Sequence, residues 1–216
     1  MNAARIAIPG RSTRAALAAA LGVGVVLLAT VVVALGPTVA RIWEEPLPEF
    51  WPAPRFQLTD QQGRSFGSDD LAGRAALFSF VYTNCTDTCP LLTATMAQVQ
   101  GQLRSDGLLG SKVQMVSVTV DPDRDSSAVL AAYADRFHAD PEAWRFLTGE
   151  REAVFDVLSG FKLNTAEVAR AFAGADVIPH SNRFAVVDPR GEVRANLQGD
   201  QVSLEEVVRT VKRVVP

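Results

Sequence analysis

The stretch AALFSFV at residues 75–81, followed after three residues by CTDTCP at residues 85–90, predicts a buried strand that turns into a helix. An uncharged run of this length is typical of a strand covered on both faces. A helical pattern starts near Cys89 or Pro90, and proline is favoured in a first helical turn. The apolar positions behind it recur every three or four residues: Leu92, Met96, Val99 and Leu103.

The apolar pattern of the rest of the chain predicts strands that alternate with helices. After an alternating strand at 55–59 and a turn into 65–66, strands are expected at 113–118 and 144–147, and a hairpin joins 184–187 to 192–197 through Asp188–Gly191. One helix is expected after an N-cap at Ser126 or Ser127, and a second over 150–161. A third is expected over 203–215, where Ser203 is the N-cap and Glu206 completes a capping box. This pattern indicates an α/β fold, a mixed central sheet with helices on both faces.

The N-terminal part of the chain has the composition of a membrane anchor. Residues 15–36 carry no charge, and 22 residues at about 1.5 Å each span a bilayer core of about 30 Å. The flanking charges, basic before the span and acidic after it, predict a cytoplasmic N-terminus. A cleaved signal peptide is the competing interpretation, but its apolar region usually has only about 7–15 residues. With 14 residues before the span, a bacterial inner membrane is expected rather than an organelle.

Three regions follow from this pattern. Residues 1–40 are the cytoplasmic N-terminus and anchor, residues 41–53 a proline-rich tether, and residues 54–216 the folded domain. The tether's aromatic residues, Trp43, Phe50 and Trp51, are expected either at the membrane interface or packed on the domain. Beyond residue 40 the chain has 18 basic and 24 acidic residues, a net charge of −6, which argues against nucleic acid as a partner.

Cys85 and Cys89 are the only cysteines, and they lie where a thiol is expected to be reactive. A helix N-terminus lowers the pKa of a nearby thiol, and Cys89 should feel this field more than Cys85. A purely structural disulfide is the alternative, although so small a loop would stabilise the fold little. His180, one of two histidines, follows Pro179 before a strand, and the topology should bring it beside Cys85. Two thiolates and one imidazole match copper(I), a soft metal.

Other polar groups have simpler interpretations. His138 is expected on the surface. The acidic run DPDRD at residues 121–125 lacks the later bidentate glutamate of a calcium loop, and it is interpreted as a solvated loop that precedes a helix.

Taken together, the segments FVYTNCTDTCP (80–90), VSVTVDPDRD (116–125), FLTG (146–149), and HS (180–181) with FAVVDPRG (184–191) resemble the Sco/SenC copper-binding proteins of the thioredoxin-like superfamily. The resemblance covers about residues 54–216. It implies a thioredoxin-like fold and three copper ligands, Cys85, Cys89 and His180, for Cu(I) and for Cu(II). Two positions depart from the family pattern: Thr86 replaces a proline, and Pro179 replaces an acidic residue.

The resemblance further implies a single-pass protein with its domain in the periplasm. Its implied function is that of a metallochaperone, which delivers copper to the binuclear copper site of cytochrome c oxidase subunit II or reduces that site's cysteines. An enzyme, a thiol-disulfide oxidoreductase acting on a partner through Cys85 and Cys89, is the alternative. A peroxidase or redox sensor is a third and weaker one.

Overall fold

The computed structural model describes residues 24, 29–31, 33, 45–85, 88–166 and 182–215. The chain divides into two compact units, Met1–Pro46 and Leu47–Pro216. No helix within the described part of the chain has the length and apolar character needed to cross a membrane. Apart from residues 24, 29–31 and 33, the predicted span at 15–36 lies outside the described residues.

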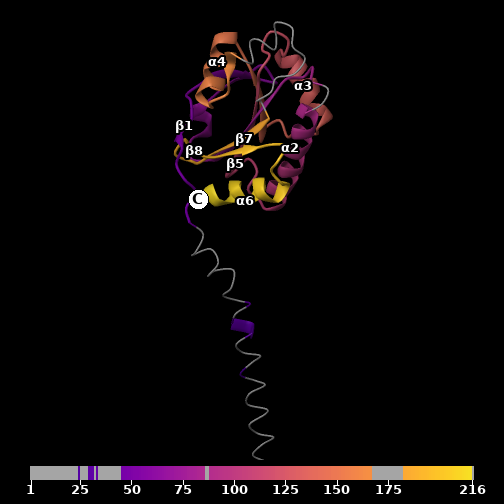
Figure 1. Cartoon of the computed structure of the whole chain (residues 1–216). Coiled ribbons are helices and arrows are strands. Elements are labelled where there is room, and N and C mark those ends of the chain that lie inside the picture. Colours follow the sequence, from indigo (N-terminus) through magenta and orange to yellow (C-terminus); the bar gives the residue numbers. More distant parts are fainter. Residues whose placement is uncertain are drawn as a thin grey trace, which may run out of the picture. The chain divides into compact units, whose positions relative to one another are not determined.

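The second unit is built on one sheet of eight strands in the order β1-β8-β7-β4-β5-β6-β2-β3. Figure 1 labels β1, β8, β7 and β5 of this sheet. Its strands are β1 (Trp51–Pro52), β2 (Gln57–Asp60), β3 (Ser65–Gly67), β4 (Ala75–Val81), β5 (Val113–Thr119), β6 (Trp144–Thr148), β7 (Arg183–Val187) and β8 (Glu192–Gln198). Strands β4, β5 and β6 are parallel, and β7 joins β4 antiparallel. The predicted mixed sheet is therefore confirmed.

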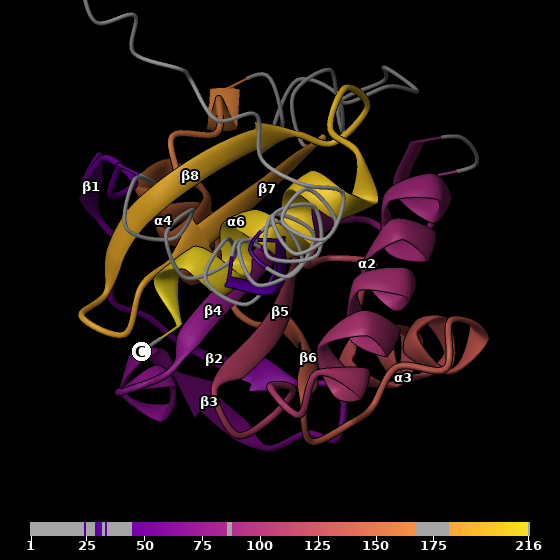
Figure 2. The ribbon, with the colours of Figure 1, turned by 90° about the horizontal axis from the view of Figure 1, so that it is seen from below.

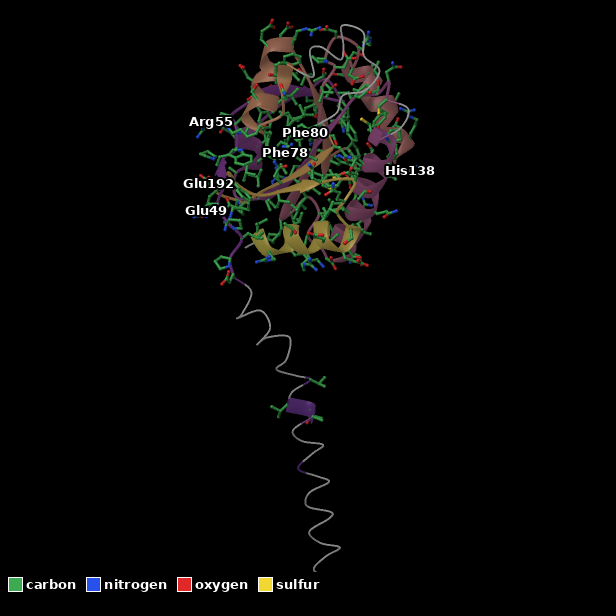
Figure 3. All side chains as sticks on the ribbon, in the orientation of Figure 1. Glu49, Arg55, Phe78, Phe80, His138 and Glu192 are labelled. Carbon is green, nitrogen blue, oxygen red and sulfur yellow. The ribbon has the colours of Figure 1, made fainter. Side chains whose placement is uncertain are left out.

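Helices cover both faces of this sheet (Figure 2). They are α2 (Thr88–Ser105), α3 (Ser127–Arg136), α4 (Arg151–Gly160) and α6 (Leu204–Val214), with a short 3-10 helix, η1 (Ser68–Leu71). Helices α2, α3 and α6 share one apolar cluster, and α4 packs into the other. Strand β4 serves both clusters because its side chains alternate: Leu77 points to the first, and Phe78 and Phe80 point to the second, inside the domain in Figure 3.

Two of the serines predicted as helix N-caps form the capping hydrogen bond. The Ser126 side chain accepts a hydrogen bond from the backbone N–H of Val129 and caps α3. Ser203 does the same for α6 by accepting from the N–H of Glu206. Asp188–Gly191 connects β7 to β8, as predicted, and Gly191 has a φ of +86°, which glycine adopts without strain.

The end of the proline-rich segment belongs to the sheet. Trp51 lies opposite Val193 in the β1–β8 pair, and the backbone N–H of Ala53 donates to the carbonyl of Gly191 at 2.8 Å. Of the two positions predicted for the tether's aromatic residues, Trp51 takes the packed one, against the α4-side cluster. Glu49 pairs with Arg190 at the sheet edge where Glu49 and Glu192 are labelled in Figure 3. Strand β4 begins at the end of the sheet where the Asp188–Gly191 turn lies, since Ala76 is opposite Val187, and the cysteines follow the other end of β4.

Candidate metal centre

Cys85 and Cys89 lie at the corner between β4 and α2. Strand β4 ends at Val81, and Cys85 follows in a turn, where its backbone N–H donates to the carbonyl of Tyr82 at 3.3 Å. Cys89 lies in the first turn of α2. The backbone N–H of Cys89 points at Cys85 Sγ over 3.3 Å. Neither cysteine is part of a disulfide. The structure therefore brings the two predicted ligands side by side without a disulfide between them.

The two thiols differ in exposure. Cys89 is 2% exposed, whereas Cys85 is partly exposed. Thr93 connects the first turn of α2 to α3. Its Oγ1 donates to the carbonyl of Cys89 at 2.8 Å and lies 2.9 Å from the hydroxyl of Tyr133 on α3. Cys89 thus has a fixed position, and Cys85 is the thiol that a partner or a metal ion meets first.

The sequence-based expectation of a lowered Cys89 pKa is wrong. Burial raises the pKa of the Cys89 thiol to about 12, and the neighbouring Cys85 adds to this increase, whereas a hydrogen bond with the backbone of Tyr82 acts in the opposite direction. Desolvation of the thiolate outweighs the helix field because the side chain lies inside the apolar core. Cys89 is therefore a neutral thiol near pH 7, and a metal ion must displace its proton.

The acidic loop after β5 is solvated only in its middle, where Asp123 and Arg124 are exposed, and the prediction of a solvated loop is wrong for its two end carboxylates. Asp121 is 3% exposed and Asp125 is 1% exposed. Asp121 pairs with Arg124 at 3.0 Å, and Asp125 accepts hydrogen bonds from the hydroxyls of Thr83 and Thr119, both at 2.6 Å. Asp125 joins this loop to the turn that carries Cys85, a contact that sequence spacing does not reveal.

His180, the third predicted ligand, lies outside the described residues, as does Pro179. The strand after it is described: Phe184 of β7 lies opposite Ser79 of β4. Asn182 lies close to Leu92 in the second turn of α2, since a Cβ added to Gly199 would come within 2.5 Å of Asn182 Oδ1 and 2.2 Å of Leu92 Cδ2. Two residues of extended chain span up to about 7 Å.

His138, predicted to be a surface residue, is exposed (Figure 3). Its carbonyl accepts a hydrogen bond from Gln100 Nε2 at 3.1 Å. Gln100 lies in α2 eleven residues beyond Cys89, which is about 16 Å along the helix. His138 is therefore remote from the thiols.

Within the described residues, no group of three or more His, Cys, Asp or Glu side chains is placed to hold a metal ion. The described part of the site consists of two thiols. Thiolates are soft donors and prefer Cu(I), Zn²⁺ or iron–sulfur clusters, so this donor set fits copper(I).

Comparison with known proteins identifies the family. The family model for SCO1/SenC matches residues 49–216. This chain belongs to the SCO1/SenC family. Among its relatives, the SCO1 protein homolog of Bacillus subtilis is 28% identical over 160 residues, which cover 73% of this chain and 79% of that protein.

Solved SCO1/SenC structures share the fold. BsSco, described as a member of the Sco family of cytochrome c oxidase assembly proteins with a disulfide switch, is 26% identical with a TM-score of 0.67, over 79% of this chain and 97% of that one. Yeast Sco1 with copper bound is also 26% identical, with a TM-score of 0.60, over 78% of this chain and 98% of that one. The predicted family resemblance is thus confirmed.

Proposed function

We propose that this chain is a membrane-tethered copper metallochaperone whose cargo is held by Cys85, Cys89 and His180. The observation that carries the proposal is the pair of thiols at the start of α2, which are not joined by a disulfide, with Cys85 Sγ 3.3 Å from the backbone nitrogen of Cys89. Two thiols four residues apart, with one sulfur against the backbone of the other cysteine, can both bind one ion. Copper-bound yeast Sco1, which shares the fold, supports copper as that ion.

The topology supports His180 as the third ligand. Strands β4 and β7 are antiparallel neighbours, so the chain after β4, which carries Cys85, and the chain before β7, which carries His180, leave the sheet at the same edge. Asn182 is close to Leu92, which follows Cys89 by one helical turn. Residue 180 is joined to Asn182 by two residues of chain, which span at most about 7 Å, and this short link supports His180 as a ligand beside the cysteines.

The proposal includes a membrane anchor in residues 1–40 and a copper-binding domain in residues 54–216, joined by the proline-rich segment 41–53, whose end pairs with the domain's sheet as β1. Their charge and hydropathy place the domain on the periplasmic side of a bacterial inner membrane. The client that fits is a protein at the same membrane with thiols of its own, such as cytochrome c oxidase subunit II. BsSco, a relative of this chain, belongs to a family of oxidase assembly proteins.

Ligand exchange gives a simple route for the copper. Loading replaces the proton of Cys89 by the ion, which cancels the burial cost of a bare thiolate. A client thiolate then binds the ion at the side of Cys85, because that thiol is the more exposed one. Cys89 releases the ion last and takes up its proton again.

A second candidate function is thiol-disulfide oxidoreductase, and the unequal exposure of the two thiols favours it. The Cys85 thiolate would attack one sulfur of a partner disulfide, forming a mixed disulfide and releasing the other partner sulfur as a thiolate. Cys89, after losing its proton, would attack Cys85 Sγ and release the second partner thiolate. The chain would end as the Cys85–Cys89 disulfide, and the partner would be reduced by two electrons.

Copper content distinguishes the two functions. We expect about one copper ion per reduced full-length chain in detergent, none in the chain oxidised to the Cys85–Cys89 disulfide, and weaker retention in His180→Ala. The oxidised chain is a matched control because its sequence is unchanged. Absence of copper from the reduced chain, together with rapid reduction of a test disulfide, would assign the oxidoreductase function instead.

A further inference from the structure

Asp125 is a buried carboxylate at the edge of the sheet where Cys85 lies. It belongs to the loop between β5 and α3, and its side chain is 1% exposed. Burial of a carboxylate is costly unless hydrogen bonds compensate it. The hydrogen bonds that Asp125 accepts therefore identify the segments that it holds in place.

Asp125 accepts bonds from two segments. Its Oδ1 accepts from Thr83 Oγ1 at 2.6 Å, its Oδ2 accepts from Thr119 Oγ1 at 2.6 Å, and the backbone N–H of Thr83 lies 3.2 Å and 3.3 Å from the two oxygens. Thr119 is the last residue of β5, and Thr83 is two residues before Cys85. The carboxylate thus connects the rigid end of β5 to the turn that carries the exposed thiol.

The loop that presents Asp125 is itself fixed. The backbone N–H of Asp125 donates to the carbonyl of Asp121 at 2.9 Å, and Asp121 is held by Arg124 and by the hydroxyl of Thr119. Asp123 forms an ion pair with Arg151 at the start of α4. Asp125 is therefore supported independently of the turn after β4, and it is the turn that would move if the bond were lost.

We propose that Asp125 is a positioning residue for copper: through Thr83 it fixes the turn before Cys85 and so sets the separation of Cys85 from Cys89. The inference rests on the proposed function. Cys89 is fixed by α2 and by Thr93, so the spacing of the two sulfurs depends on where the turn holds Cys85, whose Sγ faces the backbone N–H of Cys89 at 3.3 Å. Hydrogen bonds that orient metal ligands commonly contribute about 10–100-fold to metal affinity.

A purely electrostatic role for Asp125 makes the opposite prediction. A negative charge near the thiols opposes formation of thiolates, so its removal would strengthen copper binding. In the positioning role, removal of Asp125 or of the Thr83 hydroxyl weakens binding, and an amide at position 125 retains part of the effect because its oxygen still accepts from Thr83.

The test uses full-length chain in detergent and measures Cu(I) affinity by competition with a chromophoric chelator. We expect Asp125→Ala to lower the affinity by about 10–100-fold, and Thr83→Val and Asp125→Asn to lower it less. The Asp125→Ala/Thr83→Val pair should be non-additive, since both changes break one contact. The matched control is Asp60→Asn, another carboxylate that is 1% exposed, in β2, three strands from β4; it should leave the affinity within about twofold.

A second readout requires no copper. Loss of the Asp125–Thr83 bond should increase the alkylation rate of Cys85 several-fold, and Asp60→Asn should not change it. Wild-type affinity or tighter binding in Asp125→Ala would overturn the inference. If Asp125→Ala fails to fold, Thr83→Val decides alone, and unchanged affinity with an unchanged alkylation rate would refute the inference. A wild-type chain that binds no copper would refute the proposed function, and the alkylation rates would still judge the contact.

Discussion

The Cys85→Ser/Cys89→Ser double variant is expected to lose at least about 1,000-fold in copper(I) affinity. Whole four-ligand zinc sites contribute about 10–16 kcal/mol, so each thiolate supplies on the order of 3 kcal/mol and the pair about 6 kcal/mol. A serine hydroxyl stays protonated near neutral pH and is a hard donor, so it does not replace a thiolate on copper(I). Isothermal or chelator competition titrations of the reduced full-length chain measure this loss.

Met96→Leu is the matched control for this loss. Met96 lies in the same helix and is fully buried, and leucine nearly conserves its volume while removing a sulfur. This control should keep one copper ion per chain with wild-type affinity. Equal copper binding by the wild type and the double cysteine variant would place the copper elsewhere and contradict the account.

The second large effect is the pH dependence of copper binding. The metal binds the thiolate, and the pKa of Cys89 is raised to about 12, so this thiol is protonated throughout the range from pH 6 to 8. Binding must then release the Cys89 proton, and the apparent affinity rises tenfold for each pH unit for that proton alone. Between pH 6 and pH 8 we expect an increase of about 100-fold or more.

The sign and the source of this dependence are both testable. Acid favours the protonated thiol and weakens binding, and alkali favours the bound state until the pH approaches the pKa of Cys89. In Cys89→Ser the slope of log affinity against pH should decrease by one unit. A flat profile in the wild type, after correction for the chelator's own protonation, would show that Cys89 does not bind copper as a thiolate.

The strands and helices that frame the site were predictable from local signals. The apolar run at β4, the proline after Cys89 and the serine caps of α3 and α6 act within a few residues of the element that they define. Strand β1 was missed because it has two residues, one of them proline, and pairs with a segment about 140 positions away. Its pairing partner, rather than its own sequence, makes it a strand.

The chemistry of the site was less predictable than its residues. Cys85 and Cys89 stand out as the only cysteines and lie at a strand-to-helix corner, but the raised pKa of Cys89 follows from burial in a core that forms only in the folded chain. The role of Asp125 depends on a contact with Thr83, 42 positions earlier. A sequence pattern identifies donor atoms, whereas desolvation and long-range hydrogen bonds are properties of the tertiary structure.

The X-ray absorption spectrum of copper-loaded full-length chain, recorded beside that of His180→Ala, is the most direct test of the central claim. The account predicts two sulfur ligands and one imidazole nitrogen in the wild type, and the same two sulfurs without that nitrogen in the variant. A copper environment without sulfur, or a nitrogen that persists in His180→Ala, would contradict it.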